Sequence, residues 1–256
     1  MKNLFSIKSE EISDCMTFEE KVVVVTGGSN GIGKGIVEAF IAEKSKVIVI
    51  DKEGQNANCD FYFQGDLSKK EVLIEFSKRV IQRYGRIDYL INNACINKKG
   101  IFSDCSYEDF NYVFKTGVTA PYMLSKLFKD YFNNASIVNI SSTRALMSQQ
   151  DTESYSAAKG GIHALTHALA VSLSGIARVN SISPGWIDTS NSQWEEDDKK
   201  QHLVQRIGTV EDVVNLVMFL CSEKSGFITG ENIILDGGMT KTMIYNNDFG
   251  WHYKNK

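Results

Sequence analysis

Tyr155 and Lys159 are the residues whose types and spacing most directly suggest chemistry in this chain of 256 residues. They lie four positions apart at the start of an apolar pattern typical of a helix, so we expect their side chains on one helix face. An ammonium group beside a phenol favours the ionised phenol. Tyr155 would then give or accept a proton near neutral pH. The same pair could also be two exposed polar residues on a helix with no catalytic role. Other motifs in the chain must therefore decide between these interpretations.

A glycine-rich run forms the second candidate site. It follows a β-branched run at 21–26 and precedes a helical pattern. Glycines in such a turn let a phosphate approach the backbone and the free N–H groups of the helix. The spacing departs from G-x-G-x-x-G, but the strand–turn–helix order predicts a dinucleotide site. The residues of this turn that we expect to bind the dinucleotide are Gly27, Ser29, Asn30, Gly31, Ile32 and Gly33.

Acidic residues follow the next two predicted strands. Asp51 ends the second strand, 18 residues beyond the last glycine of the run. A carboxylate there accepts the ribose hydroxyls of NAD and repels the 2′-phosphate of NADP. We therefore expect NAD as the cofactor, with NADP less favoured. Lys52 would offset part of the repulsion of the 2′-phosphate. Asn30 stands where a basic residue would suit that phosphate, so it also favours NAD. Asp66 either accepts a hydrogen bond from the adenine amino group or caps the next helix. Leu67, the residue after it, is also expected to contact the cofactor.

The elements that must position these residues alternate along the chain. Short apolar runs typical of strands lie at 21–26, 47–50, 61–64, 87–91, 135–140, 178–182 and 231–235. Helical patterns, including one near 210–221, lie between them everywhere except between 47–50 and 61–64. One long helical stretch is expected over 107–131. This alternation predicts an α/β fold, a doubly wound parallel β-sheet with helices on both faces. Ligands of such sheets bind beyond the carboxyl ends of the strands, where the motifs above fall.

Composition excludes several classes of function. The formal charge of −3, with no basic run, gives no reason to expect nucleic acid. No apolar run reaches the roughly 18 residues of a membrane span, and the start lacks a signal peptide, so a cytoplasmic protein is expected. Five cysteines without a C-x-x-C pair indicate reduced thiols. His163 and His167 are four apart, but no further ligand completes a metal site, and none is predicted.

Taken together, these motifs resemble those of the short-chain dehydrogenase/reductase family over residues 19–240. The resemblance is carried by 26–33, Asp66, 92–94, Ser142, Tyr155 with Lys159, Pro184-Gly185 and 236–238. It implies a single-domain Rossmann fold and a nicotinamide cofactor. It also implies hydride transfer between that cofactor and a secondary alcohol or ketone. Members are mostly homodimers or homotetramers, so we expect one of these assemblies.

The resemblance assigns roles to further residues. Ser142, 13 residues before Tyr155, would hold the substrate oxygen, with Ser141 as the less favoured neighbour. Tyr155 would pass the proton, and Lys159 would also bind the nicotinamide ribose. The remaining cofactor contacts that the resemblance implies are Asn93 and Ala94 beside the adenosine, and Pro184, Gly185, Ile187 and Thr189 beside the nicotinamide.

Two residues depart from the family pattern. Cys95 stands where glycine is usual, and Gly117 stands where most members have an Asn that holds a water next to the Lys. That water normally passes protons to solvent. We expect a working but altered relay, in which Gly117→Asn leaves activity similar or raises it.

The expected organisation is an N-terminal extension at 1–18, the family domain at 19–240 with a substrate lid at 189–205, and an aromatic C-terminal tail at 241–256. Two alternatives stay open. One is a 3-oxoacyl-carrier-protein reductase using NADPH, which Asp51 and the acidic run at 195–198 disfavour. The other is a cofactor-sensing binding protein with weak catalysis, which Gly117 suggests.

Overall fold

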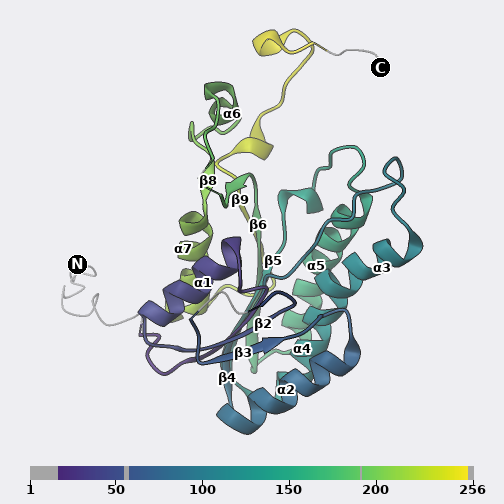
Figure 1. The fold of residues 1–256 in the computed structure, drawn as a ribbon. Helices are drawn as coiled ribbons and strands as arrows, with labels where there is room; N and C mark the ends of the chain where they lie inside the picture. Colours follow the sequence, from purple (N-terminus) through teal and green to yellow (C-terminus); the bar gives the residue numbers. More distant parts are fainter. Residues whose placement is uncertain (1–16, 55–57, 191, 253–256) are drawn as a thin grey trace, which may run out of the picture.

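Seven parallel strands form one twisted sheet in the order β3-β2-β1-β4-β5-β6-β9 (Figure 1). The computed structural model describes residues 17–54, 58–190 and 192–252. The strands are β1 (Val22–Thr26), β2 (Lys46–Asp51), β3 (Phe61–Gln64), β4 (Ile87–Asn92), β5 (Phe132–Ile140), β6 (Ala177–Pro184) and β9 (Asn232–Leu235). The predicted fold class is confirmed.

Both faces of the sheet are buried, which explains why its strands are almost continuously apolar. In β1, Val22 and Val24 pack into one core cluster, and Val23 and Val25 pack into the other. Successive side chains of a strand point to opposite faces, so one short run serves both cores. Helices α2 (Lys70–Tyr84), α4 (Ala120–Phe128) and α5 (Glu153–Ser172) contribute to the first cluster, and α1 (Gly31–Ala42) and α7 (Val210–Cys221) to the second.

The helix expected over 107–131 is broken in two. The chain forms α3 (Tyr107–Phe114), a π-helical turn at Lys115–Thr119, α4, and a short 3-10 turn at Lys129–Tyr131. A π turn holds an extra residue and interrupts the 3.6-residue period, so apolar spacing alone did not reveal it. Gly117 is buried in this turn.

The boundary of the N-terminal extension also moves. Residues 1–16 lie outside the described part of the chain. Phe18, predicted to lie in the extension, is buried and packs edge-on against Phe40 and Tyr89. The folded domain therefore includes at least this residue.

A small second sheet carries the lid. Strands β7 (Ile187–Asp188) and β8 (Gly208–Thr209) pair with each other, and α6 (Glu196–Lys200) lies between them in the chain. The tail beyond β9 runs away from the body of the domain (Figure 1). Within the described residues, no helix combines the length and apolar character needed to cross a membrane.

Candidate functional site

Hydrogen bonds pin the glycine turn to the end of β4. Thr26 Oγ1 accepts the backbone N–H groups of Asn93 and Ala94, both at 3.0 Å. The Asn93 side-chain amide in turn donates to the carbonyl oxygens of Thr26 (3.1 Å) and Gly27 (2.9 Å). Strands β1 and β4 are neighbours in the sheet, so these bonds fix the turn to the core. Asn93 therefore has a structural role that its motif did not reveal.

Close packing explains two glycines of the turn. Gly27 has φ +67°, and a Cβ there would lie 2.9 Å from Ala94 Cα. A Cβ on Gly33 would lie 2.0 Å from the carbonyl oxygen of Gly27. Neither site accepts a side chain, and the backbone of the turn is left bare at the N-terminus of α1. Such a terminus suits a phosphate group.

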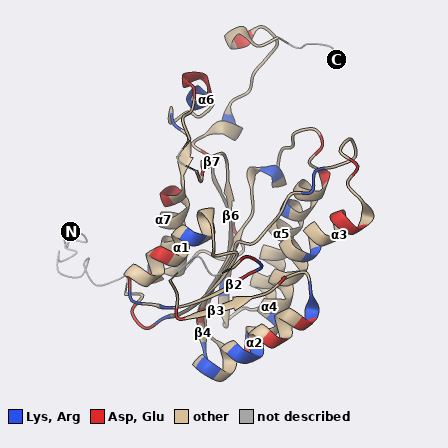
Figure 2. Cartoon of the chain, in the orientation of Figure 1, with Lys and Arg blue, Asp and Glu red and all other residues tan. Residues whose placement is uncertain are grey.

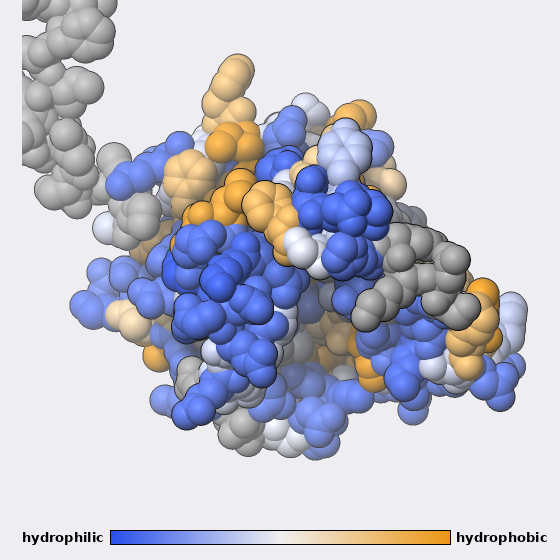
Figure 3. All heavy atoms as spheres, turned by 90° about the horizontal axis from the view of Figure 1, so that it is seen from above, coloured by the Kyte–Doolittle hydropathy of each residue, from blue (hydrophilic) through white to orange (hydrophobic). Residues whose placement is uncertain are grey.

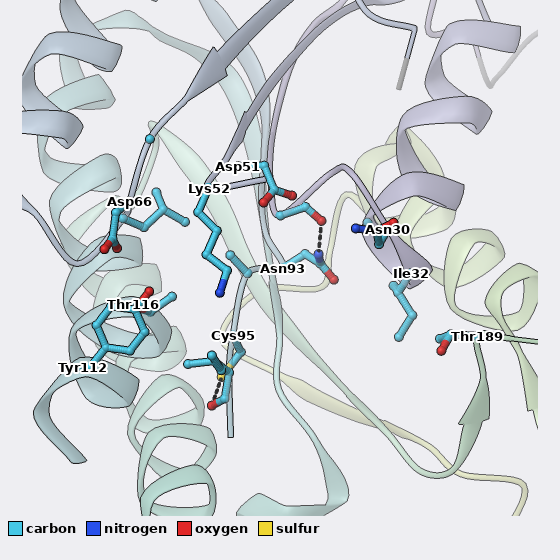
Figure 4. Close-up of a pocket in the computed structure, with 16 residues that line it drawn as sticks. Asn30, Ile32, Asp51, Lys52, Asp66, Asn93, Cys95, Tyr112, Thr116 and Thr189 are labelled. Carbon is cyan, nitrogen blue, oxygen red and sulfur yellow. Dashed lines mark hydrogen bonds between the residues drawn. The ribbon is translucent and has the colours of Figure 1, made fainter. Parts of the chain in front are cut away.

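A cavity of about 390 Å³ opens at this turn (Figure 4). Ten of the residues predicted to bind the dinucleotide line it, namely Gly27, Asn30, Ile32, Gly33, Asp51, Asp66, Leu67, Asn93, Ala94 and Thr189. Ser29 and Gly31 are not among its lining residues. Ser29 is buried, and its hydroxyl lies 3.0 Å from that of Tyr62. Gly31 opens α1 with φ +54°.

Asp51 presents a fixed carboxylate to the cavity. Its Oδ2 accepts the N–H of Ser29 at 3.0 Å, and its Oδ1 accepts the N–H of Glu53 at 3.1 Å. Sequence reasoning placed it correctly at the end of β2. Lys52, which was expected to offset part of the repulsion of a 2′-phosphate, extends its side chain into the same cavity (Figure 4). Its Nζ lies 3.9 Å from Glu53 Oε1. The cavity therefore contains an acidic and a basic group side by side.

The far end of the cavity combines Asp66 with two residues that the sequence reading missed. Asp66 Oδ1 accepts the N–H of Ser68 at 2.9 Å, and Asp66 also lines the cavity, so both readings of this residue are compatible with the structure. Burial, with a smaller contribution from Asp66, raises the pKa of the Tyr112 phenol. Thr116 Oγ1 is buried and finds no hydrogen-bond partner among the described residues. An orphaned hydroxyl, a fixed carboxylate and a bare glycine backbone fit a dinucleotide.

A second cavity, of about 290 Å³, holds the acid–base residues. It is lined by Ser142, Tyr155, Lys159, Pro184, Gly185 and Ile187, all predicted, and also by Ser141. Ile32, Asn93, Cys95 and Ile96 line both cavities. The two spaces therefore adjoin, and a ligand that fills the first can reach the side chains of the second.

Lys159 is a buried cation, with only 4% of its surface exposed. Its Nζ donates to the carbonyl oxygen of Ile140 at 2.7 Å and lies 5.3 Å from the centroid of the Tyr155 ring. Burial alone lowers the pKa of Lys159. The side chains of Cys95 and Tyr155 outweigh that effect and raise this pKa above its ordinary value. Ionised Cys95 and Tyr155 side chains therefore favour the charged form of Lys159.

The two adjacent serines differ in what their hydroxyls do. Ser141 Oγ donates to the backbone oxygen of Lys159 at 3.0 Å, which commits it to α5. Ser142 Oγ accepts the N–H of Arg144 at 3.1 Å, so its own O–H can still donate. Both serines line the cavity that contains Tyr155, but only the Ser142 hydroxyl keeps its O–H available to a ligand oxygen.

The lid is organised around Asp188. Its carboxylate accepts the indole N–H of Trp194 (3.0 Å) and the backbone N–H groups of Ser190 (2.9 Å) and Ser192 (3.0 Å). These bonds, the one from Trp194 foremost, lower the pKa of Asp188. Just beyond the lid, the two terminal nitrogens of Arg206 donate to the two carboxylate oxygens of Asp212, at 2.6 and 2.7 Å.

Helix α6 corrects one expectation about the lid. Two of the four carboxylates of the acidic run are paired within the helix, since Lys199 bonds Glu196 at 2.5 Å and Lys200 bonds Asp197 at 2.9 Å. Red and blue segments accordingly lie next to each other on α6 (Figure 2). The lid therefore presents a mixed surface, and its charge is a weaker argument against an acidic partner than the sequence suggested.

Comparisons with known proteins agree on one kind of chemistry. Over residues 27–240 the chain matches a family model described as enoyl-(acyl carrier protein) reductase. An uncharacterized oxidoreductase of Thermotoga maritima is 40% identical, over 89% of this chain and 98% of that protein. A 3-oxoacyl-(acyl-carrier-protein) reductase of the same organism is 30% identical, over 88% and 99%. An apo SCOR enzyme from Clostridium thermocellum has 44% identity and a TM-score of 0.84, with 93% and 99% of the two chains covered.

Proposed function

The chain is an oxidoreductase of the short-chain dehydrogenase/reductase family, and on that premise we propose that it interconverts a secondary alcohol and a ketone using NAD(H). The family implies a nicotinamide cofactor, which supplies or accepts the hydride when bound. One observation carries the proposal. Ser142, Tyr155 and Lys159 line a cavity that adjoins the larger one containing Asp51.

Each of the three side chains has a role that its position supports. The Ser142 hydroxyl holds the substrate oxygen, and Tyr155 exchanges a proton with that oxygen. The charged Lys159 beside the Tyr155 ring stabilises the negative charge that develops on the phenol oxygen as the proton leaves. Because Lys159 is buried, little water screens this effect.

Asp51 is the basis for proposing NAD rather than NADP. Its carboxylate is held by two backbone N–H groups and cannot easily turn away from a 2′-phosphate. We expect the protein to use NADH at least about tenfold more efficiently than NADPH. Asp51→Asn, which keeps the shape and removes the charge, should narrow that gap. The control is Glu38→Gln, which removes an exposed carboxylate outside the cavity lining. A clear NADPH preference of the unaltered protein would overturn the assignment.

One observation favours a second function, a 3-oxoacyl-carrier-protein reductase using NADPH. The ammonium of Lys52 reaches into the cavity beside Asp51, where it offsets part of the repulsion of a 2′-phosphate. The two ion pairs within α6 also weaken the repulsion between the lid and an acidic carrier protein. Turnover of a 3-oxoacyl carrier protein, compared with simple ketones and sugars and using each cofactor in turn, separates the two functions.

We further propose that the working form is a homodimer or homotetramer. Large hydrophobic side chains are exposed on α3, α4 and α5, including Tyr107, Phe110, Tyr122 and Val171. Others are exposed on the lid and the tail, and the view from above shows hydrophobic residues standing among hydrophilic ones (Figure 3). Light scattering after size exclusion tests this proposal, and a monomer at micromolar concentration would contradict it.

A further inference from the structure

The two residues that depart from the family pattern, Cys95 and Gly117, meet in space. Cys95 follows β4, and Gly117 lies in the π-helical turn between α3 and α4. A Cβ built on Gly117 would lie 3.2 Å from Cys95 Sγ and 3.2 Å from the Cβ of Ala158. The sulfur therefore fills the space next to the missing side chain. The two departures form one compensating pair.

The same sulfur belongs to the surroundings of Lys159. An ammonium has three N–H donors, and the structure gives Lys159 one oxygen acceptor, Ile140 O. The Cys95 side chain is one of the two groups that favour its charge against the effect of burial. Cys95 is only partly buried and lines both cavities, so it lies where the dinucleotide space joins the acid–base residues.

We propose that Cys95 is a positioning residue for Lys159, accepting one of its N–H groups through sulfur in the space that Gly117 leaves open. The proposal rests on the proposed function, because Lys159 acts there through Tyr155. It also revises the expectation for Gly117→Asn. A side chain at 117 must push the sulfur aside or displace Ala158, so this change alone should lower activity and not preserve it.

Thiol chemistry of the cofactor-free protein tests the contact without any turnover. Iodoacetamide attacks the thiolate, which a neighbouring ammonium favours. In Lys159→Met, alkylation of Cys95, followed by mass spectrometry, should slow relative to alkylation of Cys105 in the same sample. Cys105 is the internal control, because its sulfur contacts the carbonyl oxygen of Ser106 at 3.8 Å much as that of Cys95 contacts Ile96 at 3.7 Å. Unchanged labelling of Cys95 would overturn the proposal, whether or not a substrate has been found.

Kinetics then separates positioning from mere packing. Removing the sulfur removes a contribution that raises the pKa of Lys159, so in Cys95→Ala the alkaline limb of the kcat profile should move to lower pH. We expect kcat to fall about tenfold with little change in KM, and Cys95→Ser to restore most of it. Cys105→Ala should match the unaltered protein. A Cys95→Ala variant that loses stability but keeps the pH profile would show that the sulfur only fills space.

A double-mutant cycle between 95 and 117 tests the pairing itself. Gly117→Asn should cost less activity when Cys95 is replaced by Gly than when the thiol is present, because the new side chain then finds room. Additive losses in the cycle would show that the two departures are independent and would contradict the compensating pair.

Discussion

The nucleotide side and the lid side of the site are held together in different ways. On the nucleotide side, Thr26 and Asn93 bond across 66 to 68 residues of sequence, between neighbouring strands of the core sheet. On the lid side, Asp188 bonds residues two to six positions further on, and most of these bonds are exposed. The first set cannot break without disturbing the sheet. The second can break and re-form while the domain stays folded.

This difference suggests that the nucleotide side provides a preformed cofactor cavity and the lid side adapts to the substrate. The cofactor cavity is built by the fold itself, so we expect it to exist before any ligand binds. The substrate side depends on a segment with local contacts, so its shape can change as the ligand enters. Substitutions on the two sides should therefore differ in kind as well as size.

The largest effect is expected between the two regions, at Tyr155. Tyr155→Phe removes the hydroxyl that exchanges the proton, and activity should fall about 10²- to 10⁴-fold, the usual worth of general acid–base catalysis. Binding of NADH, followed by its fluorescence, should change little, because the phenol ring remains. Tyr122→Phe on α4, partly exposed and outside both cavity linings, is the matched control. Unchanged turnover across a broad panel of alcohols and ketones would favour the cofactor-sensing alternative.

Sequence patterns predicted most of the fold because short buried strands carry strong local signals. The strand expected at 61–64 agrees with β3 residue for residue, and the helix at 210–221 agrees with α7. The break at Gly117 was missed, since a π turn changes the period within a stretch that otherwise reads as one helix. Phe18 was missed because nothing local distinguishes a buried aromatic residue from one in a polar extension.

An intermediate effect is expected at Thr26, which ties the nucleotide side to the sheet. Thr26→Val keeps the shape but leaves the N–H groups of Asn93 and Ala94 without their acceptor. Stability should fall by roughly 1–3 kcal/mol, and KM for NAD should rise. Urea unfolding measures the stability, and initial rates at varied NAD concentration measure the KM. Thr26→Ser keeps the hydroxyl and should recover most of both; an equal loss in Thr26→Ser would place the effect in packing.

The candidate site was predictable to the extent that it lies at strand ends. Residues such as Asp51 could be placed from the sequence because a parallel sheet brings the carboxyl ends of its strands together. The places of Tyr112 and Thr116 could not be predicted, because only the packing of α3 and the π turn against the sheet brings their side chains to the same cavity. The proximity of Cys95 and Gly117 could not be predicted either, because the sequence shows only two separate departures from the family pattern.

The smallest effect is expected in the lid, where lowering the pH should break the hydrogen bonds of Asp188 only under acidic conditions. The bonds to Asp188 lower its pKa, so they stabilise the folded lid above the ordinary carboxyl pKa and are lost only as pH falls through the lowered value. Trp194 donates to Asp188 and packs edge-on against Trp186 at 4.7 Å, so tryptophan fluorescence reports the lid once Trp251→Phe removes the tail signal. Emission should stay constant from pH 8 to about 5 and change below about 4.

Asp188→Asn shows whether this signal belongs to the lid alone. In this variant the acid-type emission should appear already at pH 7, while the urea midpoint of the domain stays unchanged, because these bonds are local and exposed. A shift of the urea midpoint as large as that of Thr26→Val would mean that the lid and the nucleotide side unfold together. A shared shift of this kind would remove the contrast between a preformed cofactor cavity and an independently closing lid. A change of emission between pH 7 and 5 would instead assign the transition to a group other than this carboxylate.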